Sequence, residues 1–369
     1  MEYMRYTKSK YSTFSPFFIF SLALTLVTLA LVFLARRFVS VADFLNDTIC
    51  FWYRRAMAAF ADLFGFSLFE VLVFLIPVFL IIIIVLAVRV FKRGVGRLRF
   101  IFNLLAIVLL FYSGHNLALG ISYNTTTVDK EIGFETVKVT EENLAETMIA
   151  LRDEVNSLVN EVNFNQDGES VSGYTMDEIS TLICQSYSAL SEKYGFIPAF
   201  GSRAKAVGPF SIGMSYLGIT GIYTYFTGEA NVNTSYPEYD IVFTAAHELS
   251  HQRGILRENE ANFMAYLALS TSSDTYLRYC AALNMYQYVG SALYRTNSEL
   301  YYDIAGGLDS RAIGDIRASN AVTQKYGDTF LNDISDFVND LFLKSNGTAG
   351  IVTYGRVVVL TVSYFEASK

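Results

Sequence analysis

The residues best suited to chemistry lie in one short run of the 369-residue chain, His247-Glu248-Leu-Ser-His251. Residues four apart lie on the same face of a helix, so the imidazoles of His247 and His251 can reach one metal ion. Glu248 lies beside them and cannot easily reach the same ion, so its carboxylate stays free to accept a proton. The chain has only three histidines, and this run holds two of them. The pattern predicts a zinc site, the alternative being an ordinary pair of helix histidines beside a solvated glutamate.

The expected chemistry explains why these residue types occur together. Two neutral imidazoles and one carboxylate hold Zn²⁺ with a fourth position open to water, and the ion lowers the pKa of that water toward about 7. Glu248 is expected to act as general base and later to pass the proton to a leaving amine. The flanking sequence favours the metal, because an apolar stretch from Asp240 leads into the run and Gly254 stands where a helix commonly ends.

Two glutamates, Glu258 and Glu260, compete for the place of the third ligand. Both lie in the first turn of a helix expected after Gly254. Asn262 lies one turn beyond Glu258 on the same face, where its amide can orient a ligating histidine. Glu258 is therefore the expected ligand and Glu260 the alternative. The glutamate that does not bind the ion is expected to stabilise the helix N-terminus with its negative charge.

The motif resembles a known group of enzymes. The run from His247 to His251, followed by Glu258-x-x-Ala261-Asn262, resembles the zincin metallopeptidases and their gluzincin-like branch, although Asn262 replaces the usual Asp and the gap before Glu258 is short. Residues 221–263 resemble more closely a group of bacterial membrane proteins known only as a domain of unknown function in that clan. The resemblance implies a zincin-like domain in which the strand at residues 221–226 lies beside the metal helix and binds an extended substrate backbone.

Three apolar runs in the first 120 residues are long enough to cross the ~30 Å hydrocarbon layer of a membrane as helices. They lie at about residues 16–35, 68–88 and 100–120. The whole chain is 52% hydrophobic with a mean hydropathy of +0.33, which is too apolar for an ordinary soluble protein. Arg36-Arg37 directly after the first run is a poor context for cleavage of a signal peptide, so three transmembrane helices are expected.

The basic residues predict how these helices are oriented. They are concentrated before the first run and between the second and third, so the positive-inside rule puts both segments, and the N-terminus, in the cytoplasm. Everything after residue 120 is then expected outside the cytoplasmic membrane of a bacterial cell. Residues 1–120 carry a net charge of +7 and the remainder −14. An acidic domain of this kind argues against a nucleic-acid partner.

Residues 121–369 are predicted to form a mainly helical domain of the α+β class with a small sheet. Periodic apolar residues and capping signals predict helices at about residues 141–162, 175–194, 274–294, 309–326 and 328–343. Short strands are expected at residues 214–217 and 222–226. In the first 120 residues, the amphipathic segment 42–60 is expected either at the outer membrane interface or as an ordinary connecting helix.

Several other side chains are weaker candidates. A tyrosine or arginine near zinc can stabilise an oxyanion, and Tyr279, Arg253, Arg257 and Arg356 are candidates that the sequence cannot separate from packing residues. His115 is expected to be a helix-packing contact in the third apolar run. The three cysteines are expected to be thiols, because they form no dense disulfide framework: Cys50, Cys184 and Cys280.

The expected function is therefore that of a membrane-anchored zinc metallopeptidase acting on a peptide or protein substrate. Hydrolysis of another amide, such as one in cell-wall peptide, is an alternative reaction. A zinc-stabilised sensor or scaffold without catalysis is the alternative that is not an enzyme, and Glu248 argues against it because a structural site does not need that carboxylate. Intramembrane proteolysis is disfavoured, since the histidines lie more than 100 residues beyond the last apolar run.

Overall fold

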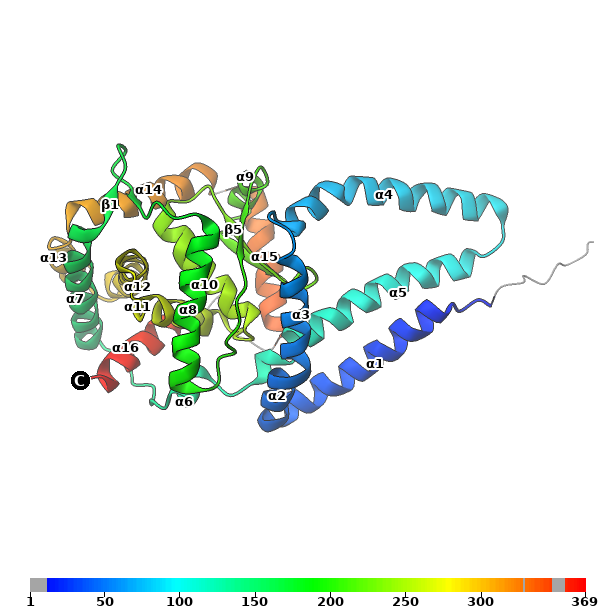
Figure 1. Ribbon diagram of the computed structural model, residues 1–369, viewed down its shortest axis with the longest axis horizontal. Coiled ribbons are helices and arrows are strands. Elements are labelled where there is room, and N and C mark those ends of the chain that lie inside the picture. The colour runs from blue at the N-terminus through cyan, green and yellow to red at the C-terminus, as the bar shows by residue number, and fades with distance from the viewer. Residues whose placement is uncertain (1–11, 328, 347–355) are drawn as a thin grey trace, which may run out of the picture.

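Three long apolar helices project from one end of the molecule (Figure 1). The computed structural model describes residues 12–327, 329–346 and 356–369. The three helices are long and apolar enough to cross a membrane, and they match the predicted runs: α1 (Pro16–Arg37), α4 (Leu68–Arg93) and α5 (Arg97–His115). After α5 the chain continues through the π-helical turn η2 (Asn116–Gly120) and the 3₁₀ turn η3 (Ser122–Asn124).

The apolar helices are not packed equally. α1 and α5 pack along each other, and the hydroxyls of Thr25 and Ser113 are hydrogen-bonded between them at 3.0 Å. α4 leaves the body of the molecule apart from α1 and α5 and approaches α5 only near the turn that connects them at the far end (Figure 1). No described residue of α4 is buried, so its apolar surface has no protein cover over most of its length.

The segment between α1 and α4 is helical, as predicted, and runs crosswise to the apolar helices (Figure 1). It comprises α2 (Val39–Leu45), the π-helical turn η1 (Asn46–Cys50) and α3 (Phe51–Ala61). Arg54 is fully buried at its centre and donates hydrogen bonds to the carbonyl of Ala118 at 3.2 Å and to Oδ1 of Asn46 at 2.9 Å. Trp52 on the opposite side remains 62% exposed. This segment therefore joins the ends of α1 and α5 to the body.

The first turn of α4 is fixed to the body by buried polar contacts. Ser67 caps α4 and donates to Oδ1 of Asn231 at 2.6 Å. The carboxylate of Glu229, 1% exposed, accepts the backbone N–H groups of Leu68 and Phe69, both at 2.8 Å. A carboxylate at a helix N-terminus satisfies donors that have no partner within the helix. These contacts join the first turn of α4 to the central strand of the sheet, residues 229–233, and we call this contact region the joint.

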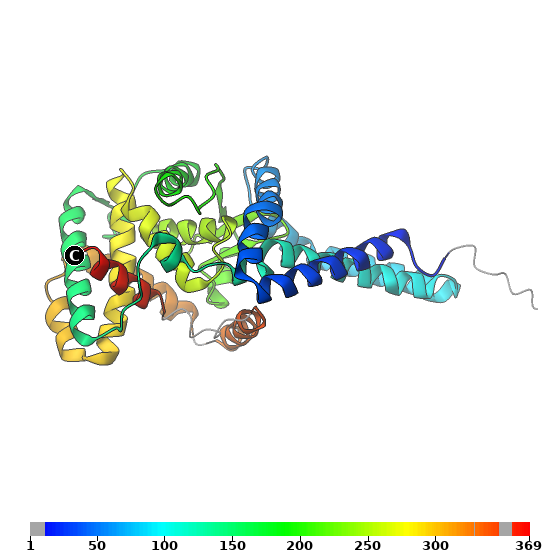
Figure 2. The ribbon, with the colours of Figure 1, turned by 90° about the horizontal axis from the view of Figure 1, so that it is seen from below.

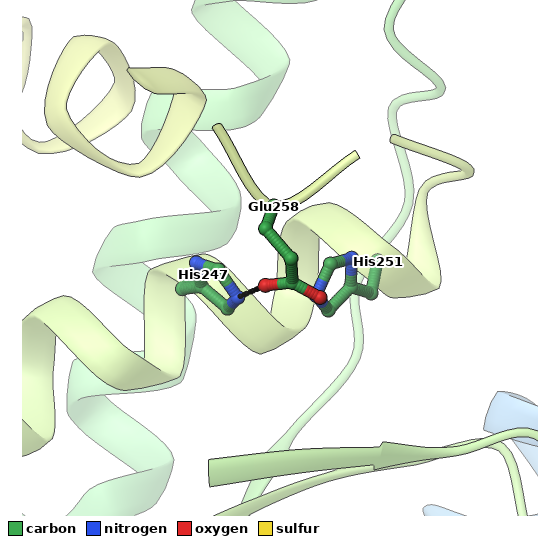
Figure 3. Close-up of side chains that lie close together, drawn as sticks. All are labelled: His247, His251 and Glu258. Carbon is green, nitrogen blue, oxygen red and sulfur yellow. Dashed lines mark ion pairs between the residues drawn. The ribbon is translucent and has the colours of Figure 1, made fainter. Parts of the chain in front are cut away.

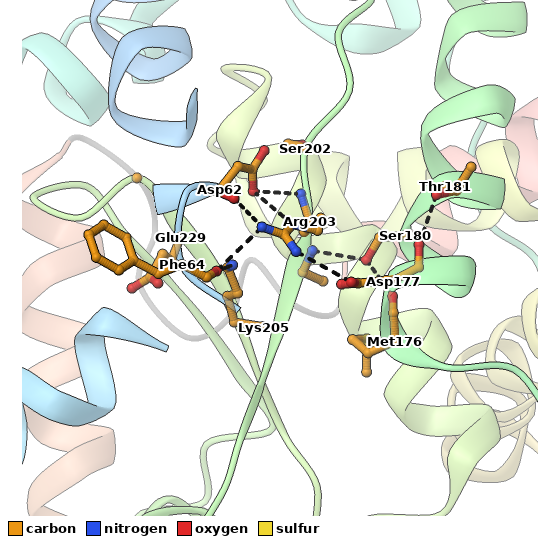
Figure 4. Close-up of polar contacts among 12 residues, drawn as sticks. Asp62, Phe64, Met176, Asp177, Ser180, Thr181, Ser202, Arg203, Lys205 and Glu229 are labelled. Carbon is orange, nitrogen blue, oxygen red and sulfur yellow. Dashed lines mark hydrogen bonds and ion pairs between the residues drawn. The ribbon is translucent and has the colours of Figure 1, made fainter. Parts of the chain in front are cut away.

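A second set of contacts strengthens the same joint (Figure 4). Arg203 donates to the backbone carbonyl of Asp62 and lies 3.3 Å from a carboxylate oxygen of Asp177. Lys205 donates to the carbonyl of Phe64. The joint thus connects residues that precede and residues that follow position 120, the predicted domain boundary.

The main sheet has three short strands in the order β3-β5-β4. β3 (Ala204–Val207) is parallel to the central strand β5 (Glu229–Asn233), and β4 (Gly221–Thr224) is antiparallel to it, with Tyr223 opposite Ala230. β4 therefore lies at one edge, which agrees with the strand expected at residues 222–226. β1 (Asn163–Phe164) and β2 (Ser170–Val171) form a separate hairpin.

The strand predicted at residues 214–217 was wrong. Residues 211–216 form a short helix, α9 (Ser211–Tyr216), with Met214 buried and Ile212 exposed. The carboxylate of Glu70 accepts the backbone N–H of Phe210 at 2.8 Å and so satisfies a donor at the start of this helix. A partner 140 residues away in sequence thus overrides the local preference of Ile and Tyr for strands.

The remaining helices include all those that the sequence predicted. Thr140 and Thr175 form the capping boxes of two of them. Their bounds are α6 (Val128–Ile132), α7 (Glu141–Leu158), η4 (Val159–Glu161), α8 (Met176–Tyr194), α10 (Glu238–Gln252), α11 (Glu258–Ser270), α12 (Thr275–Thr296), α13 (Ser298–Ala305), α14 (Ser310–Tyr326), α15 (Phe330–Ser345) and α16 (Val357–Ala367).

The largest hydrophobic core lies around α10, α11 and α12. α10 packs on β5 and β4 with one face and on α11 and α12 with others. Tyr239, Val242, Ala246 and Leu249 of α10 are completely buried, as is Phe263 of α11. A helix buried on most sides holds its polar residues in fixed positions, because the close-packed core leaves them little room to move.

Candidate metal centre

His247, His251 and Glu258 converge on one point (Figure 3). The histidines lie one turn apart on α10, and Glu258 is the first residue of α11. Nε2 of His247 lies 3.2 Å from Oε2 of Glu258, and Nε2 of His251 lies 3.6 Å from Oε1. One ligand atom from each residue falls within 4.8 Å of the other two. This spacing lets a single metal ion contact all three.

The turn between α10 and α11 explains how a ligand so close in sequence reaches the histidines. Gly254 has a φ of +96°, a left-handed conformation that glycine adopts without strain. Its N–H donates to the carbonyl of His251 at 3.0 Å, and the N–H of Ile255 donates to that of Ser250 at 3.1 Å. A Cβ at position 254 would collide with the guanidinium of Arg54. The chain therefore reverses sharply and returns Glu258 to α10.

Both imidazoles are oriented by acceptors at their other nitrogen. Nδ1 of His247 lies 2.9 Å from Oδ1 of Asn262, and Nδ1 of His251 lies 2.8 Å from the carbonyl of Ile255. An acceptor at Nδ1 favours the tautomer with the proton there, which leaves Nε2 free to bind a metal. Asn262 thus lies where the sequence predicted. The hydroxyl of Tyr288 on α12 donates to the same Oδ1 at 3.3 Å, a contact that the sequence analysis missed.

Glu260, the alternative third ligand, has other partners. Arg257 donates to its two carboxylate oxygens at 2.8 and 2.9 Å, and the N–H of Val128 lies 3.4 Å from Oε1. Arg257 also donates to the carbonyl of Thr125. Glu260 therefore ties the first turn of α11 to the segment that follows α5. Of the two glutamates, the structure brings only Glu258 to the histidines.

Glu248 is a buried carboxylate beside this cluster, 4% exposed. It accepts a hydrogen bond from the backbone N–H of Tyr223, whereas its Oε2 has no hydrogen-bond partner among the described residues. Burial raises the pKa of Glu248. A buried acceptor without a partner is costly unless something else occupies that position, so the free oxygen marks a place for a proton donor.

The edge strand β4 passes directly over Glu248. A Cβ at Gly221 would lie 2.6 Å from Oε1 of Glu248 and 2.5 Å from Cγ2 of Thr244. Only glycine leaves enough room for the backbone to approach the carboxylate so closely. This contact brings the strand expected to bind a substrate backbone to the residue expected to act as base.

The charges within the cluster depend on one another. Burial alone would lower the pKa of His251, but the carboxylates of Glu258 and Glu248 and the carbonyl of Ile255 together outweigh burial and raise that pKa to about 9. Burial would likewise raise the pKa of Glu258, but the two imidazoles outweigh it and lower that pKa. Without a metal, a proton on His251 neutralises the carboxylate. A bound cation would take over this role.

The structure does not bring the proposed oxyanion residues to the cluster. The hydroxyl of Tyr279 donates to Asp315 at 2.7 Å within the core. Arg253 lies over the rings of Tyr187 and Phe200. The other two also lie elsewhere: Arg257 in its pair with Glu260, and Arg356 exposed at the start of α16.

The remaining histidine and the cysteines also lie away from the centre. His115 has ring contacts with Tyr225 and Phe342, which agrees with a packing role. The thiols are separate and buried: Cys50, Cys184 and Cys280.

Comparison with known proteins assigns the chain to a family without assigning a function. No curated protein and no solved structure matches it. One family model matches residues 46–362, a range that begins in η1, ends in α16 and includes every residue of the candidate metal centre. Because this range covers most of the sequence, the chain belongs to the family described as "Protein of unknown function (DUF3810)".

Proposed function

We propose that this protein is a membrane-anchored zinc metallopeptidase of zincin type, in which His247, His251 and Glu258 bind the metal and Glu248 is the general base. The observation that carries the proposal is the buried Oε2 of Glu248, which has no partner among the described residues and lies beside three converging ligands. A purely structural cluster has no use for such a group, because its burial without a partner only destabilises the fold.

The donor set suits zinc better than the common alternatives. Two imidazole nitrogens and one carboxylate oxygen form a typical catalytic zinc site, whereas calcium and magnesium prefer sites made of oxygen. Zn²⁺ bound by these three residues would leave one coordination position for water and would lower the pKa of that water toward about 7. A fourth protein ligand would instead favour a structural role, and the described residues supply only three.

The protein's own residues would then carry out the proton transfers. Glu248 would take a proton from the attacking water, because its Oε2 has no partner among the described residues and lies beside the three ligands. The same residue would return the proton to the leaving amine. The fixed N–H of Tyr223 holds the carboxylate in place for both steps.

The edge strand β4 is the proposed binding site for the substrate backbone. It pairs with β5 on one side, and an extended peptide on the other side would add a strand to the sheet next to Glu248. Recognition through backbone groups requires a peptide or protein substrate with an unfolded stretch. Cell-wall peptide offers shorter extended segments, so an amidase acting on it is the second choice.

The proposed location follows from the apolar helices and the basic residues near them. α1, α4 and α5 would span the cytoplasmic membrane of a bacterial cell, with the Arg- and Lys-rich turn between α4 and α5 inside. The residues after α5 would then lie outside the cytoplasm.

Metal analysis of the purified full-length protein tests the proposal. We expect about one zinc per chain, its loss in Glu258→Ala and its retention in Glu260→Ala, because only Glu258 faces the histidines. Zinc loss in Glu260→Ala alone would reverse the ligand assignment. No bound metal in the unsubstituted protein, purified without chelators, would contradict the proposed function.

A further inference from the structure

α15 carries an apolar face that nothing in the described protein covers. Phe337 is 69% exposed, Leu341 60% and Val338 56%. The residues of this face recur at helical spacing, and the set is Phe330, Leu331, Ile334, Phe337, Val338 and Leu341. Outside this helix, the exposed large apolar residues described after residue 124 are scattered. An apolar patch of this size on a helix marks an interaction surface.

The opposite face of α15 is mostly polar and turns toward the protein. Its less exposed positions recur at the same spacing and include Asn332, Asn339 and, in the last turn, the buried Leu343. A side chain at Gly218 would meet the amide of Asn332, and the hydroxyl of Thr329 donates to the carbonyl of Tyr216 at 3.2 Å. A helix that belonged to the protein core would turn its apolar face inward. α15 has the reverse arrangement.

The ends of the apolar helices hold the other end of α15. Arg36, next to last in α1, donates to the carbonyl of Ser345 at 3.0 Å. His115, the last residue of α5, stacks edge-on against Phe342 with ring centroids 5.5 Å apart. α15 therefore lies where α1 and α5 meet the body, and it runs crosswise to them (Figure 1). In Figure 2 it is seen end-on while those helices lie in the plane of the view.

From this placement we infer that α15 is an interfacial helix whose apolar face rests in the lipid surface. The inference depends on the membrane anchoring proposed above for α1, α4 and α5. A helix that is perpendicular to the spanning helices and level with their ends lies in the plane of the membrane surface. Lipid is the occupant that the position favours, because the uncovered face lies beside helices whose own surfaces are apolar and exposed.

This contact would hold the candidate active site close to the bilayer. α15 begins beside Gly218, just before β4, and its last turn contacts His115, whose ring also contacts Tyr225 just after β4. The two ends of α15 thus lie near the residues that precede and follow β4. A substrate that reaches β4 would do so at the membrane surface.

Fluorescent labels on introduced cysteines test the inference in the full-length protein reconstituted into phosphatidylcholine vesicles. Leu341→Cys and Phe337→Cys carry the label on the apolar face, and Asp336→Cys is the matched control on the exposed polar side. Ile82→Cys, exposed in the middle of α4, reports on anchoring itself. The native thiols are buried, so the unsubstituted protein should take little label.

We expect lipids with a spin label high on the acyl chain to quench the label at positions 341 and 337 several-fold more than the label at 336, which aqueous iodide should quench instead. Equal access of iodide to 341 and 336, with lipid quenching at 82, would overturn the inference and leave the anchoring intact. Protection of 341 from both quenchers would indicate a protein partner and also overturn it. Absence of lipid quenching at 82 would overturn the anchoring together with the inference.

Discussion

Glu248 and Glu229 are both buried carboxylates next to the three-stranded sheet, and they differ in their partners. Both oxygens of Glu229 accept backbone N–H groups from the first turn of α4, each at 2.8 Å. Glu248 has the N–H of Tyr223 at its carboxylate, while its Oε2 has no partner among the described residues. Glu229 is part of the joint between α4 and β5, whereas Glu248 lies beside the metal ligands.

The difference separates a structural carboxylate from one available for chemistry. A fully paired carboxylate stabilises the folded state, because the helix N-terminus supplies donors that would otherwise be unsatisfied. An incompletely paired one contributes less to stability, and its position beside a converging ligand cluster supports the proposed role as base. The same residue type thus has different surroundings at the two places, and these surroundings suggest different roles.

The largest expected effect is on hydrolysis by Glu248→Gln. An amide of the same shape cannot accept the proton, so we expect kcat for a peptide substrate to fall by roughly 10²- to 10⁴-fold. Zinc content should be unchanged, because Glu248 is not among the three converging ligands. Hydrolysis of an unstructured protein such as casein, with metal analysis on the same sample, measures both. Full activity in this variant would remove Glu248 from the mechanism.

Glu229→Gln should lower the stability of the fold, whereas Glu248→Gln should lower the rate of hydrolysis. The variant loses a charged acceptor and directs an amide NH₂ at a backbone N–H, which should reduce stability by roughly 2–3 kcal/mol, about 30- to 150-fold in the folding equilibrium. Thermal unfolding of the detergent-solubilised protein measures the loss, with Glu248→Gln as the matched control that should show little. Zinc binding per folded molecule should persist. Equal stability of the two variants would show that their partners do not distinguish them.

The candidate metal ligands were easier to predict from sequence than the joint, for a physical reason. They fall within twelve residues, and helical spacing alone indicates that His247 and His251 share a face, whereas Glu258 reaches them through the turn at Gly254. The joint pairs Ser67 with Asn231, and no local pattern reports a contact over 164 residues. The same limit explains the error at α9, where Glu70 supplies the partner of Phe210. The apolar helices were predictable because composition alone marks them.

Two features of the candidate metal centre could not be predicted from the sequence. Tyr288 reaches Asn262 from α12, and with 25 tyrosines in the chain no pattern singled it out. The choice between Glu258 and Glu260 depended on which of them pairs with Arg257, and the sequence could not predict this. In the structure Arg257 pairs with Glu260. The close approach of β4 to Glu248 could have been predicted from Gly221, since a glycine inside a strand often marks a close approach of the backbone.

Asn262→Ala tests the same idea at a candidate metal ligand: it removes the hydrogen-bond partner of His247 and leaves Glu248 unchanged. His247 would lose the acceptor that fixes its tautomer, so we expect zinc affinity to fall by about 10- to 100-fold. Competition with a calibrated chelator measures it. Tyr288→Phe is the matched control, because it removes only the hydroxyl that donates to Asn262, and its loss should be smaller. An unchanged affinity in Asn262→Ala would mean that packing alone orients the imidazole.

The smallest change to the site is the loss of a single proton, and the pH dependence of zinc binding reports on it. Burial lowers the pKa of His251, but Glu258, Glu248 and the carbonyl of Ile255 together raise it to about 9, so the metal-free site should hold a proton on His251 between pH 6 and pH 8. Zinc needs the neutral imidazole and must displace that proton, so the apparent affinity should rise about tenfold per pH unit in this range and level off above pH 9. Chelator competition across this range measures the slope.

Glu258→Gln provides the matched control for this slope. Without the Glu258 carboxylate, the pKa of His251 loses the strongest of the influences that raise it, so the proton should leave at lower pH and the slope should be shallower near pH 8 even though binding is weaker. A flat profile in the unsubstituted protein would instead mean that His251 is already neutral beside Glu258. In that case burial would control the pKa of His251. Glu258, like Glu248, would then be a buried carboxylate without a positively charged partner until a metal binds.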